Sequence, residues 1–320
     1  MIVDVAIFLV GLTLLSWSAD RFVYGASALA GNLGISPMII GLTIVAMGSS
    51  APEIMVSFTA SFAGNPDTAV GNALGSNITN IALVLGATAL FKPMLVASST
   101  LKREMPMLIA ATLLGIYCLA DQQLSRNEGI VLIIAFFVAI FAVCWLSMHA
   151  DKKDRLEQEI SDELDLDVKM PKALMWLVIG MILLPVSAQY MVGSAVNIAK
   201  FFGMSDLIIG LTIIAIGTSL PELAASVVSM RKGEDDMALG NIIGSNIFNI
   251  LAVLAMPGLV APGSVDADAA GRDSYVMLAL TLLLVIFSFN FRGQRRINRW
   301  QGGVLLALFI LYQIILVVNH

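Results

Sequence analysis

Two blocks of residues occur twice in this sequence, and the two copies of each block are separated by the same distance. Residues 41–53 read Gly-Leu-Thr-Ile-Val-Ala-Met-Gly-Ser-Ser-Ala-Pro-Glu, and nine of these 13 residues recur 169 positions later at 210–222. Residues 71–81 recur at the same offset at 240–250, with eight of 11 residues identical. A single offset for both blocks indicates that the chain consists of two homologous halves.

The composition indicates that both halves lie in a membrane. Of the 320 residues, 58% are hydrophobic and 13% are charged, whereas a soluble domain carries about 25% charged residues. A helix needs about 20 apolar residues to cross a bilayer, and such runs occupy almost the whole chain. We predict an all-α polytopic membrane protein with ten transmembrane helices, at 3–28, 37–62, 70–91, 104–120, 127–148, 173–200, 207–230, 238–258, 274–291 and 301–318.

Each half contains five predicted spans. Because five is an odd number, the second half must enter the membrane upside down relative to the first. We therefore predict two inverted five-helix repeats, residues 1–148 and 173–320, joined by a hydrophilic linker at 149–172.

The distribution of positive charges gives the orientation. If the N-terminus lies outside, 14 of the 18 Lys and Arg residues fall in cytoplasmic loops, as the positive-inside rule requires. Both termini are then outside and the linker is cytoplasmic. Asp20 and Arg21 fall near the inner end of the first predicted span, where an interfacial salt bridge or a snorkelling pair is expected.

Each half places a proline and a glutamate in the middle of a span, as Pro52-Glu53 and Pro221-Glu222. Proline lacks a backbone N–H and clashes with the carbonyl four residues earlier, so we predict that helices 2 and 7 are broken. Paired broken helices in inverted halves are typical of a transporter's midplane site. A carboxylate at the bilayer centre costs about 3 kcal/mol on insertion scales and usually marks an ion path. The alternative is a pair of protonated glutamates that serve packing.

Further oxygen-bearing side chains surround the glutamates in the sequence. Small residues can also mediate helix packing, which is the alternative for Ser57 and Ser226. The repeated glycines are interpreted as close-packing positions, and the asparagines as ion ligands or as partners in an interhelical hydrogen bond. The hydroxyl and amide residues are Ser49, Ser50, Ser57, Ser76, Asn80, Thr218, Ser219, Ser226, Ser245 and Asn249, and the glycines are Gly71, Gly75, Gly240 and Gly244.

Convergence of the two halves would produce a site made of oxygen atoms alone. Such a site suits hard cations, namely Ca²⁺, Na⁺ or else Mg²⁺ or Mn²⁺. Two ionised glutamates carry a charge of −2, which balances one Ca²⁺ or two Na⁺. The two ions should therefore compete for the same site.

The pair Gly-Ser-Ser-Ala-Pro-Glu (48–53) and Gly-Thr-Ser-Leu-Pro-Glu (217–222), each followed by Gly-Ser-Asn-Ile, resembles the two alpha repeats of the calcium/cation antiporter superfamily. The resemblance is closest to the sodium/calcium exchanger branch. It implies alpha motifs at 41–81 and 210–250, a bacterial inner-membrane location and transported ions at Glu53 and Glu222. It also implies ligands from Ser49, Ser50, Ser76, Asn80, Thr218, Ser219, Ser245 and Asn249, and from the backbone carbonyls of Ala46 and Ala215.

One position departs from some members of that superfamily. Potassium-dependent exchangers carry an aspartate where this chain has Asn249, so the resemblance argues against potassium co-transport here. The proton-coupled branch usually has Gly-Asn before the acid in the first motif, which this chain lacks at 48–53.

The sequence thus predicts a secondary antiporter that exchanges Ca²⁺ for Na⁺ by alternating access, with spans 1 and 6 as the moving elements. Proton-coupled exchange of Ca²⁺ or another divalent cation is the alternative, and a passive cation channel is a third reading. We expect no cofactor, no nucleic-acid partner and a functional monomer in the lipid bilayer. An enzyme is disfavoured because the only histidines, His149 and His320, lie away from the repeated serines.

Overall fold

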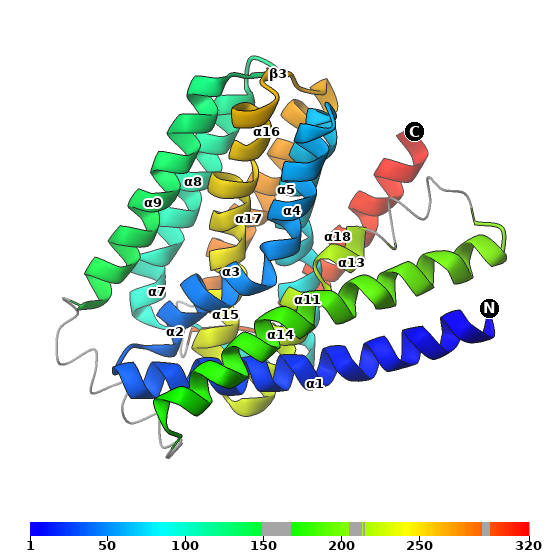
Figure 1. Ribbon diagram of the computed structural model, residues 1–320. Helices are drawn as coiled ribbons and strands as arrows, with labels where there is room; N and C mark the ends of the chain where they lie inside the picture. The colour runs from blue at the N-terminus through cyan, green and yellow to red at the C-terminus, as the bar shows by residue number, and fades with distance from the viewer. Residues whose placement is uncertain (149–167, 205–212, 214, 290–294, 320) are drawn as a thin grey trace.

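The computed structural model describes residues 1–148, 168–204, 213, 215–289 and 295–319, and these residues are almost entirely helical (Figure 1). The all-α prediction is therefore confirmed. Most of the predicted linker, residues 149–167, lies outside the described residues.

The first half contains a long helix, a broken span, two further spans and a final helix. Its elements are α1 (Ile2–Leu33), α2 (Pro37–Ile40), η1 (Gly41–Val45), α3 (Ala46–Ser49), α4 (Ala51–Phe62), α5 (Pro66–Thr79), η2 (Asn80–Leu85), α6 (Gly86–Phe91), β1 (Met94–Leu95), α7 (Ser98–Lys102), α8 (Glu104–Leu119), β2 (Gln123–Leu124) and α9 (Arg126–Met148). The segments labelled η are π-helical.

The second half repeats this order. Its described elements are α11 (Met170–Phe201), α13 (Ala215–Thr218), α14 (Leu220–Lys232), α15 (Asp235–Phe248), η4 (Asn249–Val253), α16 (Ala255–Val260), β3 (Gly263–Ser264), η5 (Ala269–Asp273), α17 (Ser274–Ser288), β4 (Arg296–Ile297) and α18 (Arg299–Asn319).

These elements form the ten predicted spans. Among the described residues, seven helices are long and apolar enough to cross a membrane, and the bent pair Pro37–Ser49 and Ala51–Phe62 forms an eighth span. The other two are α8, which has 16 residues, and the broken helix that contains α13 and α14. The predicted start of that seventh span, residues 207–212, lies outside the described part of the chain.

Two predicted boundaries were wrong by five residues. α1 continues to Leu33 instead of ending at 28, because the signal that ends it is Gly34 in the left-handed conformation (φ 63°), which glycine adopts without strain. The ninth span begins at Ala269 instead of 274, because the π-helical turn η5 precedes α17.

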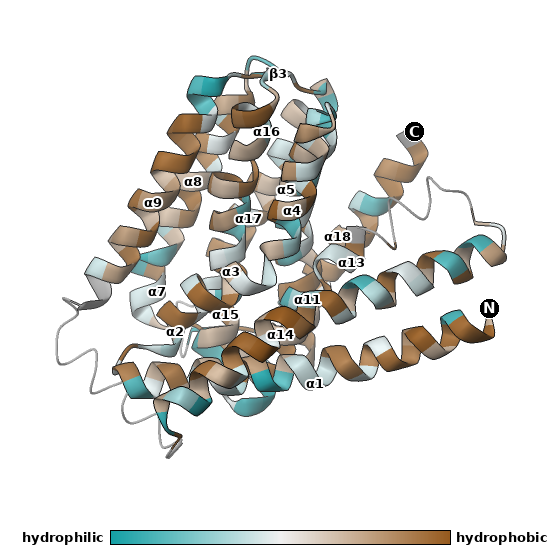
Figure 2. Cartoon of the chain, viewed as in Figure 1, coloured by the Kyte–Doolittle hydropathy of each residue, from teal (hydrophilic) through white to brown (hydrophobic). Residues whose placement is uncertain are grey.

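The outer surface of the bundle suits lipid. Figure 2 shows hydrophobic residues along the length of α9, with hydrophilic residues gathered near its upper end. Phe137 and Phe141 on this helix are 65% and 68% exposed. Exposed aromatic side chains in such a row are stable against hydrocarbon and unfavourable in water.

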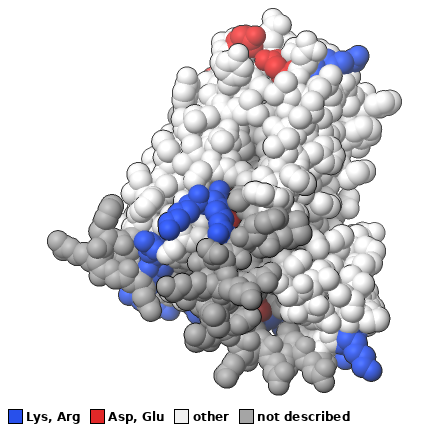
Figure 3. Space-filling model, turned by 90° about the vertical axis from the view of Figure 1, so that its left-hand side faces the viewer, with Lys and Arg blue, Asp and Glu red and all other residues white. Residues whose placement is uncertain are grey.

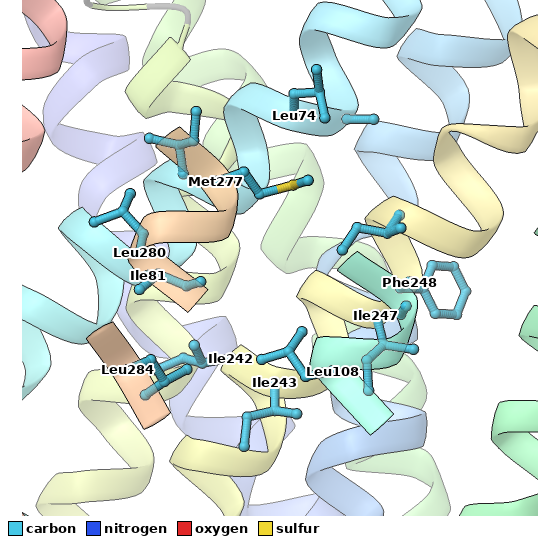
Figure 4. Close-up of a cluster of buried hydrophobic side chains, with 14 of the residues drawn as sticks. Leu74, Ile81, Leu108, Ile242, Ile243, Ile247, Phe248, Met277, Leu280 and Leu284 are labelled. Atoms are coloured by element: carbon cyan, nitrogen blue, oxygen red, sulfur yellow. The ribbon is translucent and has the colours of Figure 1, made fainter. Parts of the chain in front are cut away.

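The buried hydrophobic residues form two core clusters, and each contains residues of both halves. Figure 4 shows side chains from α5 and η2 of the first half meeting side chains from α15 and α17 of the second. Leu108 of α8 joins them and is fully buried. The two halves therefore pack together through this larger cluster, and α1 and α11 contribute to the second one.

The loops of the two halves pair with each other in two short antiparallel sheets. β1 of the first half pairs with β4 of the second, and β3 of the second half pairs with β2 of the first. β1 and β3 occupy the same position in the repeat, 169 residues apart. The sheets are thus related by the inverted repeat, and each one joins the halves.

The two long helices α1 and α11 lie side by side as an antiparallel pair (Figure 1). Glycines allow their backbones to approach closely. A Cβ atom at Gly25 would lie 2.4 Å from the backbone nitrogen of Leu177, and one at Gly180 would lie 2.6 Å from Cα of Phe22. Small residues give the same close approach in other membrane helix pairs.

The repeated glycines of the second half lie at close helix contacts, as predicted. A Cβ atom at Gly240 would lie 2.5 Å from the carbonyl oxygen of Met38, and one at Gly244 would lie 2.5 Å from that of Leu42. At Gly71 and Gly75 no described atom lies within 4 Å of such a Cβ. Gly71 is exposed, so the close-packing prediction was wrong there, and at Gly75 it stays a prediction.

We expect Gly240→Ala to destabilise the protein by about 1–3 kcal/mol, because the added methyl group meets backbone that cannot move aside. Gly71→Ala is the matched control at the equivalent repeat position. Gly71 is exposed, so alanine there should be neutral or stabilise the helix by up to about 1 kcal/mol. Thermal unfolding in detergent measures both variants. Equal melting temperatures for the two would contradict this account of the crossing.

Candidate functional site

Both predicted helix breaks are present, and each lies at a serine. Ser50 separates α3 from α4, which are bent by 45°, and Ser219 separates α13 from α14. The two serines have nearly the same backbone angles, φ −88° and ψ 8° against φ −92° and ψ 8°. This region of φ and ψ is sparsely populated. Pro52 and Pro221 follow within the first turn of the next helix, where proline is tolerated.

Glu53 and Glu222 follow these prolines and are the central acidic residues. Each lies in the first turn of its helix, where the helix dipole favours negative charge. Both side chains are 0% exposed. Ser50, three positions before Glu53, hydrogen-bonds to the carboxylate of Glu222, so the two glutamate-bearing turns belong to one buried centre. Among the described residues no Lys or Arg side chain is buried, so no cationic side chain neutralises the pair.

Hydrogen bonds across the two halves bring the repeated blocks together. Ser50 Oγ donates to Glu222 Oε1 at 2.9 Å. Ser49 Oγ lies 3.5 Å from Ser245 Oγ, and either hydroxyl can be the donor. Residues more than 170 positions apart in sequence thus meet at one buried centre.

The two asparagines Asn80 and Asn249 each begin a π-helical segment, η2 and η4. Single π turns within helices occur frequently at functional sites. η2 contacts α14 and η4 contacts α4, so each asparagine-bearing turn packs against the glutamate-bearing helix of the opposite half. Both asparagines are fully buried, and neither side chain has a hydrogen-bond partner within the described residues. The alternative of an interhelical hydrogen bond is therefore wrong for the described part of the chain.

Several buried polar atoms at this centre lack a protein partner. Buried polar side chains are usually hydrogen-bonded, so such a group of exceptions requires an explanation. Bound cations would satisfy the oxygens. Within the described residues the unpartnered atoms are Glu53 Oε1 and Oε2, Glu222 Oε2, Ser219 Oγ, and both side-chain amide atoms of Asn80 and Asn249.

The remaining predicted ligands differ in burial and in whether their oxygen atoms already accept hydrogen bonds. Ser76 is buried, and Thr218 is half-buried. The carbonyl oxygen of Ala46 already accepts hydrogen bonds from Ser50 N at 2.9 Å and Ser49 Oγ at 3.3 Å. Ala215 is the first residue of α13, four positions before the break.

The carboxylate, hydroxyl and amide side chains of this centre offer oxygen atoms as ligands. The described residues contain no group of three or more His, Cys, Asp or Glu that could hold a metal ion. Two carboxylates with hydroxyl and amide oxygens can bind a hard cation. Such a cation would be transported cargo.

Sequence reasoning missed two positioning residues, Asn72 and Asn241. Asn72 Nδ2 donates to the carbonyl oxygen of Glu53 and to Ser57 Oγ, both at 3.0 Å. The equivalent Asn241 Nδ2 donates to the carbonyl oxygen of Glu222 at 3.3 Å and to Ser226 Oγ at 3.0 Å. Each asparagine therefore braces the backbone of one glutamate, and Ser57 and Ser226 accept its second hydrogen bond. The sequence did contain a signal for them, because both copies of the second repeated block begin with Gly-Asn.

Asn241 also connects the two halves directly. Its Oδ1 accepts a hydrogen bond from Ser49 Oγ at 3.1 Å. One side chain thus contacts the backbone of Glu222 and a predicted ligand of the first half. Its burial is complete, so the loss of these bonds would leave several polar groups unsatisfied.

Comparison with known proteins gives one consistent result. The family described as sodium/calcium exchanger protein matches residues 3–145 and 172–318. CaxA of Alkalimonas amylolytica is 61% identical, with 99% of each chain covered. The inner membrane protein YrbG of Escherichia coli is 43% identical, with 98% of this chain and 96% of YrbG covered.

Solved structures of the sodium–calcium exchanger NCX_Mj have the same fold. The structure of that protein soaked with Na⁺ and Sr²⁺ superposes with a TM-score of 0.84 at 33% identity, and 98% of each chain is covered. The sodium/calcium exchanger MaX1 of Methanosarcina acetivorans is 31% identical, again with 98% of each chain covered.

We expect Asn241→Ala to lower the free energy of unfolding by about 1–3 kcal/mol, because it leaves buried hydrogen-bonding groups unsatisfied. Asn197→Ala is the control, since Asn197 makes one exposed hydrogen bond to Asp4 at 3.0 Å and should change stability by less than about 0.5 kcal/mol. Denaturation in detergent compares the two variants. An Asn241→Ala protein as stable as the control would show that the brace contributes little.

Proposed function

Since this chain belongs to the sodium/calcium exchanger protein family, we propose that it exchanges Ca²⁺ for Na⁺ across its membrane by alternating access. The observation that carries the proposal is the buried centre, where Glu53 and Glu222 meet without a cationic side chain and with unpartnered oxygens. Such a centre leaves negative charge for transported cations to neutralise. The family consists of membrane-embedded cation transporters and not of enzymes.

In this proposal the two glutamates are ligands that both ions share. One Ca²⁺ or two Na⁺ balance their charge of −2, so the occupied centre is close to neutral when it crosses the low-dielectric interior. The hydroxyl and amide oxygens decide which ion fits. The proposed ligands are Glu53, Glu222, Ser49, Ser50, Ser76, Asn80, Thr218, Ser219, Ser245 and Asn249, with the carbonyls of Ala46 and Ala215.

Asn249 limits the charge available at the centre. Its amide occupies a fully buried position against the helix that carries Glu53, and it is neutral where an aspartate would add a third negative charge. Two carboxylates suffice for Ca²⁺ or two Na⁺. This supports exchange without potassium co-transport.

The proposed moving elements are α1 and α11. They pack on each other, and they also contact the glycines next to the helix breaks. A Cβ atom at Gly48 would lie 2.8 Å from Cζ of Phe22, and one at Gly217 would lie 2.4 Å from Cγ2 of Val192. Sliding of this pair would therefore cover or uncover the break in each half, which supports their role as a gate.

The proposed orientation places both termini in the periplasm and the linker in the cytoplasm of a bacterial cell. Figure 3, which shows the left-hand side of the view in Figure 1, supports it. On this face Lys and Arg lie mainly in the middle and lower parts, and the largest patch of Asp and Glu lies at the upper end. An excess of positive charge at one end is typical of the cytoplasmic side. We propose that the monomer is functional, because both glutamates come from one chain.

Proton-coupled exchange is the second candidate. Both carboxylate oxygens of Glu53 lack a hydrogen-bond partner within the described residues, so this group could bind a proton in place of Na⁺. The two mechanisms differ in the gradient that drives Ca²⁺ uptake.

We expect Na⁺-loaded proteoliposomes to take up labelled Ca²⁺ in Na⁺-free medium, and Glu53→Gln or Glu222→Gln to reduce the initial rate at least about tenfold, since each removes more than about 1.4 kcal/mol of ion binding. Glu128→Gln is the control, because Glu128 lies in the first turn of α9, where its carboxylate accepts hydrogen bonds from Ser125 N and Oγ at 2.7 Å. Uptake driven by a proton gradient without Na⁺ would support the second candidate instead. Uptake unaffected by either central substitution would overturn the site.

A reversible cross-link tests the gate. Lys232 Nζ lies 2.8 Å from Asp20 Oδ1, so cysteines at these two positions in a Cys144→Ser background can be joined by a bifunctional thiol reagent that is reducible. We expect joining α1 to α14 to stop exchange, and reduction to restore it. Each single-cysteine protein treated in the same way is the control. Full exchange in the cross-linked protein would show that α1 does not move relative to α14.

A further inference from the structure

A groove separates α1 from α14 on the surface of the bundle. Its volume is about 440 Å³. Apolar side chains line most of it, among them Leu12 and Leu15 of α1 and Leu223 and Val227 of α14. Leu12 is 44% exposed, so the groove opens to the surroundings of the helices, which are lipid in this family.

One end of the groove is charged. Asp20, Arg231 and Lys232 line it there, and Lys232 Nζ is 2.8 Å from Asp20 Oδ1. Asp20 thus offsets the charge of Lys232, and it also lies 3.8 Å from Arg21 Nε. Arg231 is exposed, and no described residue forms a hydrogen bond or an ion pair with its guanidinium. The groove therefore combines an apolar channel with one uncompensated positive charge at its end.

We propose that this groove binds an anionic phospholipid, with one acyl chain along the apolar side chains and the phosphate on Arg231. The charges are complementary, because a phosphodiester carries one negative charge and arginine binds phosphate with paired hydrogen bonds. Basic pockets between transmembrane helices are known binding places for anionic head groups.

The length of the groove fits this occupant. Eleven residues separate Leu220, at its apolar end, from Arg231, which corresponds to about 16 Å of helix at about 1.5 Å per residue. One leaflet contributes about half of the roughly 30 Å hydrocarbon core. An acyl chain whose phosphate sits at Arg231 therefore reaches the far end of the groove.

Binding would join α1 to α14 through the lipid. The lipid should then stabilise the arrangement of the two helices that the structure describes. This effect does not depend on which cations the protein carries, so it can be measured without transport.

Phosphatidylglycerol and phosphatidylcholine, titrated separately into the full chain in a neutral detergent, test the proposal through the melting temperature and through native mass spectrometry of retained lipid. We expect phosphatidylglycerol to raise the melting temperature and to be retained, and phosphatidylcholine to act much more weakly. Arg231→Gln should weaken the apparent affinity for phosphatidylglycerol about tenfold, equivalent to about 1.4 kcal/mol. Lys102→Gln removes an exposed positive charge outside the groove and should leave the affinity unchanged.

A second variant tests the apolar part. Val227→Phe fills the groove, and we expect it to reduce retention of phosphatidylglycerol while Arg231 remains in place. Equal effects of the two lipids on the unchanged protein, or full retention of phosphatidylglycerol by Arg231→Gln, would overturn the proposal. In either case Arg231 would serve only the orientation of the chain in the membrane.

Discussion

Two carboxyl groups are buried at the centre of this apolar bundle, and no buried Lys or Arg among the described residues neutralises them. Removal of such charges from water costs several kcal/mol per ion unless the surroundings compensate. The helix breaks compensate in part, since they place Glu53 and Glu222 in the first turns of α4 and α14. Bound cations or protonation would compensate for the remainder. In the proposed function, the burial that destabilises the empty centre is therefore what favours ion binding there.

Duplication supplies each part of this centre twice. Asn72 and Asn241 hold the two glutamate-bearing turns in the same way, and η2 and η4 begin at equivalent asparagines. The halves are not identical in detail, because Asn241 alone also receives a hydrogen bond from Ser49 across the interface within the described residues. The two sides of the centre can thus differ in stiffness while presenting the same chemical groups.

The sequence predicted the features that follow from local pattern. Apolar runs gave the spans, Pro52 and Pro221 gave the breaks, and the offset of 169 residues gave the convergence of the glutamates. Features that depend on contacts between distant segments could not be predicted in this way. The close crossing at Gly240 and the bracing role of Asn72 exist only once the helices are packed, because each involves a backbone group that the sequence pattern does not place.

The two small sheets have a consequence for how such a molecule can move. β1–β4 and β2–β3 each join a loop of one half to a loop of the other, and further backbone bonds extend them, from Val96 N to Arg295 O at 2.9 Å and from Val265 N to Gln122 O at 2.8 Å. If one half rocked against the other, the backbone hydrogen bonds of one of these two sheets would break, whichever end of the bundle opened. Sliding of the α1–α11 pair over the core would leave the hydrogen bonds of both sheets intact. In the proposed mechanism, these sheets hold the loops of the two halves together while α1 and α11 move over the core.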